Sequence, residues 1–100
     1  MDTLVVSLEA EEDVFQIWLY LLGEANVVTA NRIEAELLDA FASLAQTPGK
    51  GHRRSDLTMS NVLFYTLYQY MVVYQLGPPV RILGVLHGKR DLKRVLGDRF

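Results

Sequence analysis

The sequence predicts an α+β domain in which an antiparallel sheet packs against an α-helical hairpin. Two observations predict this class. The first half of the chain carries two stretches of helical periodicity joined by a short link, and the second half carries three runs of β-branched and aromatic residues. The predicted order is βααβββ(α), ending in a short helix. With 100 residues, the chain suits a single domain spanning residues 1–100.

The first half is expected to form one strand and two helices. Thr3–Leu8 has high β-propensity, and the acid-rich run that follows it starts a helix ending near Glu24. The core stripe of this helix consists of Ala10, Val14, Ile17, Trp18 and Leu21. Asn26 or Thr29 caps a second helix that runs to about Gln46. The short link between helices of similar length implies an antiparallel pair.

The second half is expected to form a loop and a three-stranded meander. Thr47–Ser60 contains prolines and glycines that break any periodicity. The strands that follow are Asn61–Leu67, Gln69–Leu76 and Val80–His87. Gly77-Pro78-Pro79 is a turn, and Asp91–Leu96 is a short terminal helix that Asp91 caps. All three strands are apolar on both faces, so we expect the helices to cover one face and a partner to cover the other.

The first helix carries more apolar surface than one core needs. Phe15, Leu19 and Leu22 are interpreted as lying beside the core stripe, which widens the apolar arc to roughly 200°, where about 100° is usual. Two interpretations remain open. The helix is buried between two elements of its own domain, or it offers a second face to a protein partner.

Several classes of function have no support in the composition. The chain has no cysteine, which excludes disulfides and thiolate metal sites, and its two histidines have no metal-ligand spacing with acids. We therefore expect no metal and no cofactor. No signal peptide and no membrane-spanning helix are expected, and a cytoplasmic location fits.

The charge is strongly polarised along the chain. Residues 1–46 have a net charge of −8 and residues 47–100 a net charge of +6, which together give −2. The positive charge falls into two groups, Lys50, His52, Arg53 and Arg54 in the loop and His87, Lys89, Arg90, Lys93 and Arg94 near the end. Such groups hold phosphates or an acidic protein surface. The alternatives are a solvated loop, a His87 that caps the sheet, an Arg90 paired with Asp91, and an exposed helix face.

Four segments resemble, in order, the ParE toxins of bacterial toxin–antitoxin pairs. They are Asp13–Tyr20 with its Ile-Trp-x-Tyr run, the connector Leu44–Leu57, the strand Tyr70–Tyr74, and the closing segment Val80–Leu96. The closing segment contains Ile82-Leu83, Val85-Leu86-His87 and Arg90-Asp91-Leu92. The resemblance covers about residues 3–97. It implies a toxin that inhibits DNA gyrase and is neutralised by a labile ParD-like antitoxin, in a hetero-oligomer.

The related RelE toxins share the fold but cut messenger RNA on the ribosome, which needs cations near the scissile phosphate. Gly88-Lys89-Arg90 resembles the RelE turn, but Val62-Leu63-Phe64-Tyr65 stands where its lysines are expected. Met71 and Leu96 replace an expected arginine and tyrosine. The sequence therefore favours a gyrase inhibitor without a reaction of its own and without specific nucleic-acid binding. A ribosome-dependent endoribonuclease using His87 and Arg90, and a degenerate non-toxic module that only binds antitoxin, remain as alternatives.

On this hypothesis two sets of residues make the contacts. The target-binding residues are His87, Lys89, Arg90, Lys93 and Arg94. The antitoxin-binding residues are Phe15, Trp18, Leu19, Leu22, Arg53 and Arg54.

Overall fold

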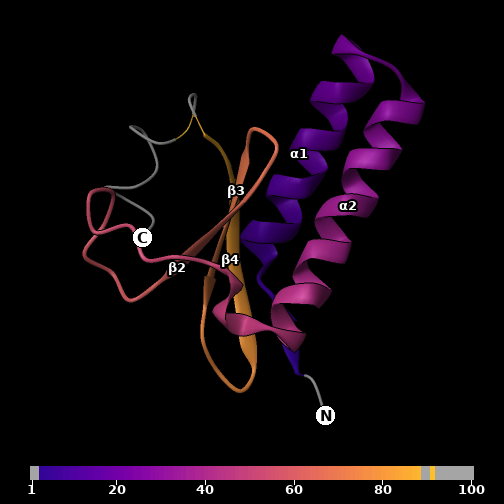
Figure 1. The fold of residues 1–100 in the computed structure, drawn as a ribbon. Helices are drawn as coiled ribbons and strands as arrows, with labels where there is room; N and C mark the ends of the chain where they lie inside the picture. The colour runs from indigo at the N-terminus through magenta and orange to yellow at the C-terminus, as the bar shows by residue number, and fades with distance from the viewer. Residues whose placement is uncertain (1–2, 89–90, 92–100) are drawn as a thin grey trace.

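The computed structural model describes residues 3–88 and 91, and it has the predicted order of elements (Figure 1). The helices are α1 (Leu8–Glu24) and α2 (Val27–Gln46), followed by the 3-10 turn η1 (Pro48–Lys50). The strands are β1 (Leu4–Val6), β2 (Leu63–Leu67), β3 (Tyr70–Gln75) and β4 (Val80–His87). The α+β class is confirmed. The predicted terminal helix lies outside the described residues, apart from Asp91.

The four strands form one sheet in the order β1-β4-β3-β2. Strands β2, β3 and β4 form the antiparallel meander that the sequence predicts. The sheet is not antiparallel throughout, because β1 joins β4 in parallel. The Val80 N–H donates to the Thr3 carbonyl at 3.1 Å, and the Ser7 N–H donates to the Ile82 carbonyl at 3.0 Å. These bonds place the start of the chain beside its last strand.

Both helices begin at a residue whose side chain caps the first turn. The Ser7 hydroxyl accepts the Ala10 N–H at 3.0 Å, so β1 ends earlier than the predicted Thr3–Leu8 and Leu8 is helical. The Asn26 side-chain oxygen accepts the Thr29 N–H at 2.8 Å. Asn26, and not Thr29, is therefore the cap of α2.

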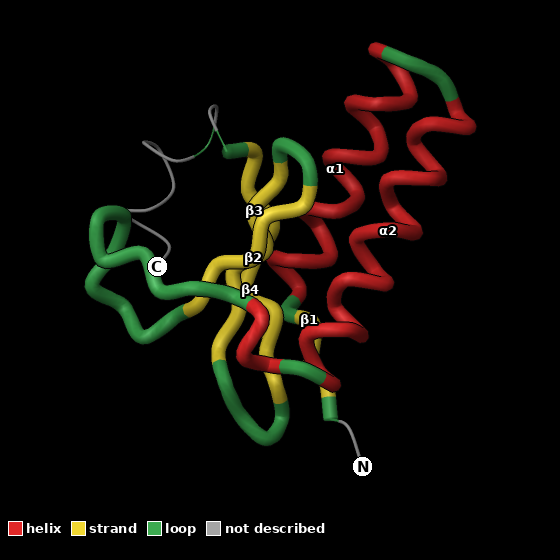
Figure 2. The backbone as a smooth tube through the Cα atoms, viewed as in Figure 1, coloured by secondary structure: helices red, strands yellow, loops and turns green. Residues whose placement is uncertain are grey.

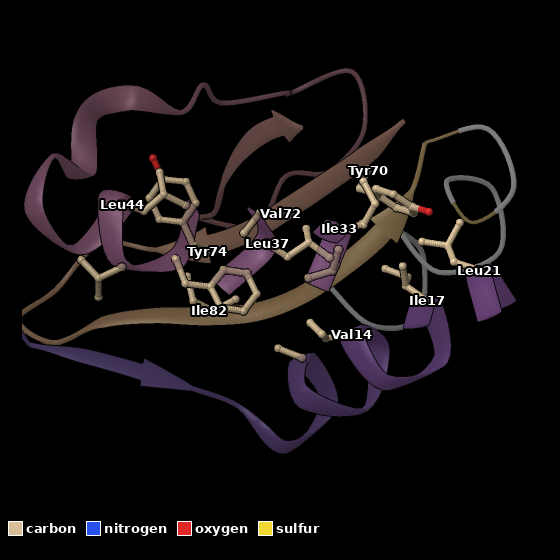
Figure 3. Packing of buried hydrophobic residues seen from close by; sticks show 14 of the residues in the cluster. Val14, Ile17, Leu21, Ile33, Leu37, Leu44, Tyr70, Val72, Tyr74 and Ile82 are labelled. Carbon is tan, nitrogen blue, oxygen red and sulfur yellow. The ribbon is translucent and has the colours of Figure 1, made fainter. Parts of the chain in front are cut away.

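The main core lies between the helices and one face of the sheet (Figure 3). Tyr70, Val72 and Tyr74 of β3 point toward this layer. The helices meet them with Val14, Ile17, Leu21, Ile33, Leu37 and Leu44. Val14, Ile17 and Leu21 belong to the core stripe predicted for the first helix, because a stripe at helical spacing can be buried only on one side of its helix.

The second face of the sheet is covered by the chain's own loop, which lies on the side away from the helices (Figure 2). A second cluster of buried residues occupies this face, namely Val62, Phe64, Met71, Val73 and Leu86. Leu57 of the loop packs against the cluster. A partner is therefore not needed to bury these residues, because the loop between α2 and β2 supplies apolar side chains of its own.

Among the helices that the structure describes, none is both long enough and apolar enough to cross a membrane.

Candidate functional site

A cavity of about 360 Å³ lies where the β2–β3 turn meets the end of β4. Its described lining residues are Arg54, Thr66, Tyr68, Gln69, Met71, His87 and Gly88. Arg54 comes from the basic loop and His87 from the end of β4, and no local sequence pattern links these two basic groups. The fold brings them together because the loop crosses the outer face of the sheet.

His87 is held by backbone and ring contacts. The backbone N–H of His87 donates to the Asp91 carboxylate at 2.9 Å, and the backbone N–H of Asp91 donates to the His87 carbonyl at 2.9 Å. The imidazole meets the Tyr70 ring edge-on, with the ring centres 5.8 Å apart. Asp91 therefore closes the turn after β4, while the helix that it was predicted to cap lies outside the described residues, and His87 is a fixed, half-buried group at the cavity.

Arg54 forms an ion pair with Asp56 in the same loop. Its guanidinium donates two hydrogen bonds to Asp56, at 2.9 and 2.8 Å. These bonds raise the pKa of Arg54 and hold the pKa of Asp56 below its usual value. Both side chains are open to solvent, so the pair orients the guanidinium more than it stabilises the fold. Arg53 is exposed and, with Arg54, lines a smaller cavity of about 100 Å³.

Tyr68 forms the corner of the cavity and was not among the predicted site residues. It has a left-handed backbone with φ of 55°, an unusual conformation for a tyrosine. Its hydroxyl donates to the Glu36 carboxylate of α2 at 2.8 Å, which raises the Tyr68 pKa. The predicted strands leave only Tyr68 between them, whereas the turn between β2 and β3 contains Tyr68 and Gln69, and no Gly or Asn in the sequence marks where the positive φ falls.

The loop is anchored to the sheet by a tyrosine from the core. The Tyr74 hydroxyl donates to the Pro48 carbonyl at 2.6 Å and accepts the Gly51 N–H at 2.8 Å. His52 then pairs with Phe64 through two backbone bonds, at 2.9 and 2.8 Å. These bonds fix where the loop starts and so where Arg53 and Arg54 lie.

The outward face of α1 carries the apolar residues predicted to contact an antitoxin. Phe15, Leu19 and Leu22 are exposed, so the interpretation that α1 is buried between two elements of its own domain is wrong. Their placement beside the core stripe is also wrong for Leu19, which lies about 160° from Leu21 around the helix axis. Trp18 is half-buried, and its indole N–H donates to the Asn31 side-chain oxygen of α2 at 2.8 Å.

The start of α1 carries unbalanced negative charge. A cavity of about 700 Å³ is lined there by Leu8, Glu9, Glu11, Glu12 and Asp13. Asp13 has a structural role, because its carboxylate accepts the Val85 N–H at 2.9 Å beyond the end of β1.

Of the other predicted target-binding residues, Lys89, Arg90, Lys93 and Arg94 lie outside the described residues. In residues 3–88 and 91, no group of three His, Asp or Glu side chains is placed to hold a metal ion.

Comparison with known proteins finds solved structures with the same fold and identifies the family of this chain. A chain of the chromosomal ParDE toxin–antitoxin system from P. aeruginosa superposes with a TM-score of 0.75 at 18% identity, covering 87% of this chain and 96% of that one. A chain of the RelBE2 toxin–antitoxin complex from Mycobacterium tuberculosis superposes with a TM-score of 0.61 at 21% identity, covering 85% and 88%. A search of the curated proteins gave no significant match. The family model of the ParE toxin of the type II toxin–antitoxin system parDE matches residues 4–92. The chain therefore belongs to the ParE toxin family.

Proposed function

We propose that this chain inhibits DNA gyrase by direct protein–protein contact and that a cognate antitoxin neutralises it. The observation that carries the proposal is the chemistry of the outer sheet face. Phe64 and Met71, at positions where the RelE pattern leads us to expect cations, lie in a buried apolar cluster. Phosphoryl chemistry needs charge stabilisation near the scissile bond, and buried apolar side chains cannot supply it.

The basic groups then act as contacts with an acidic surface on the target. His87 lies at the cavity with Arg54, and Lys89, Arg90, Lys93 and Arg94 continue the sequence from it. Arg54 and His87 at a mostly apolar cavity suit recognition of a protein surface, with the charges steering association. The work would be done in the cytoplasm, where gyrase acts on DNA.

The test is a supercoiling assay with purified gyrase and the purified full chain. We expect supercoiling to be blocked, and a double variant Arg90→Ala and Arg94→Ala to lose most of the inhibition. Arg32→Ala is the matched control, because it removes an arginine from the acidic half that is already paired with Glu36 at 3.1 Å. Normal supercoiling in the presence of the folded wild-type chain would rule out the gyrase contact.

One observation favours a second candidate, a ribosome-dependent endoribonuclease. Arg54 and His87 line the same cavity, and an arginine and an imidazole at one site can offset charge on a phosphate and move a proton. Translating extracts treated with the chain would then show codon-specific cleavage of messages that His87→Ala abolishes. Intact messages at a dose that stops growth would exclude this activity. Unchanged growth under strong expression would favour the degenerate module that only binds antitoxin.

The antitoxin contact is proposed for the exposed apolar residues of α1 and for Arg53 and Arg54 of the loop. Phe15, Leu19 and Leu22 leave apolar area in water, which a partner would bury. Both regions are open to solvent in the chain alone. A toxin–antitoxin hetero-oligomer follows from this arrangement.

A further inference from the structure

The turn between β2 and β3 has an unusual residue at its first position. Tyr68 and Gln69 form the turn, between the paired residues Leu67 and Tyr70, and Tyr68 has φ of 55°. In a two-residue hairpin loop this position ordinarily carries Gly, Asn or Asp, because the left-handed conformation crowds a side chain against the following carbonyl. A tyrosine keeps such a conformation only where its surroundings hold it.

The group that holds Tyr68 comes from α2. The Tyr68 hydroxyl donates to the Glu36 carboxylate at 2.8 Å, and Arg32 pairs with the same carboxylate at 3.1 Å. A hydrogen bond to a charged acceptor is stronger than one between neutral groups. Because Tyr68 is exposed, packing of its ring does little to fix the residue. The bond to Glu36 therefore ties the turn to the helical layer.

The other residue of the turn is bonded to the end of β4. The Gln69 carbonyl accepts the Gly88 N–H at 2.8 Å, directly after the pair that joins Tyr70 to His87. The approach is close, since a Cβ at Gly88 would lie 3.3 Å from the Gln69 carbonyl oxygen. Figure 2 shows the β2–β3 turn and the end of β4 at the same end of the sheet. Tyr68, His87 and Gly88 all line the cavity of about 360 Å³.

We infer that Tyr68 is a positioning residue for the contact with the target, an inference that rests on the proposed function. Its bond to Glu36 fixes the turn, and the turn fixes Gly88 through the Gln69 carbonyl. Gly88 follows His87, and the remaining proposed target-binding bases come directly after it in the sequence. Holding this point before association lowers the ordering cost of binding. Tyr68 acts through these contacts and need not touch the target itself.

The first arm of the test measures the concentration of the purified full chain that half-inhibits supercoiling by gyrase. Tyr68→Phe keeps the ring and removes the hydroxyl, and it should raise this concentration about threefold to tenfold, as loss of a partly exposed bond to a charged group does. Glu36→Ala should act alike. The double variant should add little to either single variant, because both remove the same bond.

Two control variants belong to this arm. Tyr65→Phe removes a phenol hydroxyl from β2 and leaves the bond between Tyr68 and Glu36 intact. Arg32→Ala removes the ion pair of Glu36 and leaves the same bond intact. Both should keep inhibition within about twofold of wild type, as surface changes of this kind do.

The second arm separates positioning from stability. Tyr68→Gly suits φ of 55° and has no hydroxyl, so its unfolding midpoint should stay near that of the wild-type chain. It should nevertheless lose about threefold to tenfold in inhibition, because the bond to Glu36 is gone.

Hydrogen exchange, followed by NMR, reports the position of Gly88 directly. In Tyr68→Phe the Gly88 N–H should exchange about threefold to tenfold faster, since the carbonyl that accepts it is less firmly held. The Val80 N–H donates to the Thr3 carbonyl at the other end of β4. It is the internal reference and should exchange at the wild-type rate.

The outcomes separate this inference from the proposed function. Wild-type inhibition by Tyr68→Phe and Tyr68→Gly, or an unchanged exchange rate at Gly88, would overturn the inference and leave the gyrase contact standing. Equal acceleration at Gly88 and Val80 would also overturn it, by assigning the effect to a general loss of stability. If the folded wild-type chain does not inhibit gyrase, the proposed function fails, and exchange at Gly88 then decides alone whether Tyr68 positions this residue.

Discussion

Tyr74 links the core of the sheet to the loop that carries Arg53 and Arg54. Its ring is fully buried, while its hydroxyl bonds to both Pro48 and Gly51. Gly51 has no room for a side chain, since a Cβ there would lie 2.5 Å from the Tyr74 hydroxyl oxygen. The position of the loop therefore depends on a tyrosine and a glycine that are 23 residues apart.

Tyr74→Phe is expected to destabilise the chain by about 1–3 kcal/mol, because it leaves a partly buried N–H and a carbonyl without partners. Urea unfolding followed by circular dichroism measures the change. Tyr65→Phe is the matched control, since Tyr65 lies on β2 with its ring 5.4 Å from the Lys50 ammonium and should lose little without its hydroxyl. Equal stability of the Tyr74→Phe and wild-type chains would contradict the anchoring role.

Ionisation of Tyr74 is expected to lower the free energy of unfolding at high pH. Burial raises the pKa of Tyr74 above its ordinary value of 10.0, and the bond to Glu36 raises that of Tyr68. Above about pH 10 the unfolded chain releases these protons while the folded chain retains them, so the free energy of unfolding falls as pH rises toward the folded pKa values.

Unfolding curves at pH 8 and pH 10.5 should show this loss. The loss should be smaller in Tyr74→Phe, which has no phenol to ionise there, even though that variant is less stable at pH 8. A loss of the same size in the Tyr74→Phe and wild-type chains would assign the alkaline sensitivity to other groups.

At the scale of the element, α1 is fixed to β4 through side chains at its first turns. The Ser7 hydroxyl caps the helix and also donates to the Leu83 carbonyl at 3.2 Å, and Asp13 accepts the Val85 N–H. These contacts continue the edge of β4 beyond the short β1. They orient α1 on the sheet, and with it the exposed face that carries Phe15 and Leu22.

Ser7→Ala should therefore cost more than loss of an ordinary cap. A cap alone is worth about 1 kcal/mol, and this change also removes the bond to Leu83. Asn26→Ala is the comparison, because the Asn26 side chain caps α2 by accepting the Thr29 N–H and is not bonded to β4. Thermal unfolding should place Ser7→Ala below Asn26→Ala, and the reverse order would argue against the tertiary role of Ser7.

At the scale of the whole molecule, the chain is closed by pairing its first strand with its last. The Thr3 carbonyl and the Ser7 N–H bond to β4. The backbone N–H and carbonyl of Val5 point to β4 as well, because the backbone groups of alternate residues in a strand point to the same side. Leu4 and Val6 direct theirs away from β4. Pairing across some 75 residues joins the acidic half to the basic half in one sheet.

Proline substitutions in β1 test this closure. Val5→Pro removes an N–H that faces β4 and should destabilise the fold by about 1–3 kcal/mol. Leu4→Pro, one residue earlier, removes an N–H that faces outward and should be tolerated much better. Similar unfolding midpoints for both variants would contradict the parallel register.

The sequence by itself determined the class of fold, the order of the elements and the family resemblance. It did so because helical stripes such as Val14, Ile17 and Leu21 and the β-branched strands follow from local periodicity. Only the tertiary structure decided what is non-local. It placed β1 parallel to β4, covered the outer face of the sheet with the chain's own loop, left Phe15 and Leu22 exposed, and joined Arg54 to His87 at one cavity. The physical reason is that these features depend on which distant segments pack together, and periodicity within one segment does not contain that information.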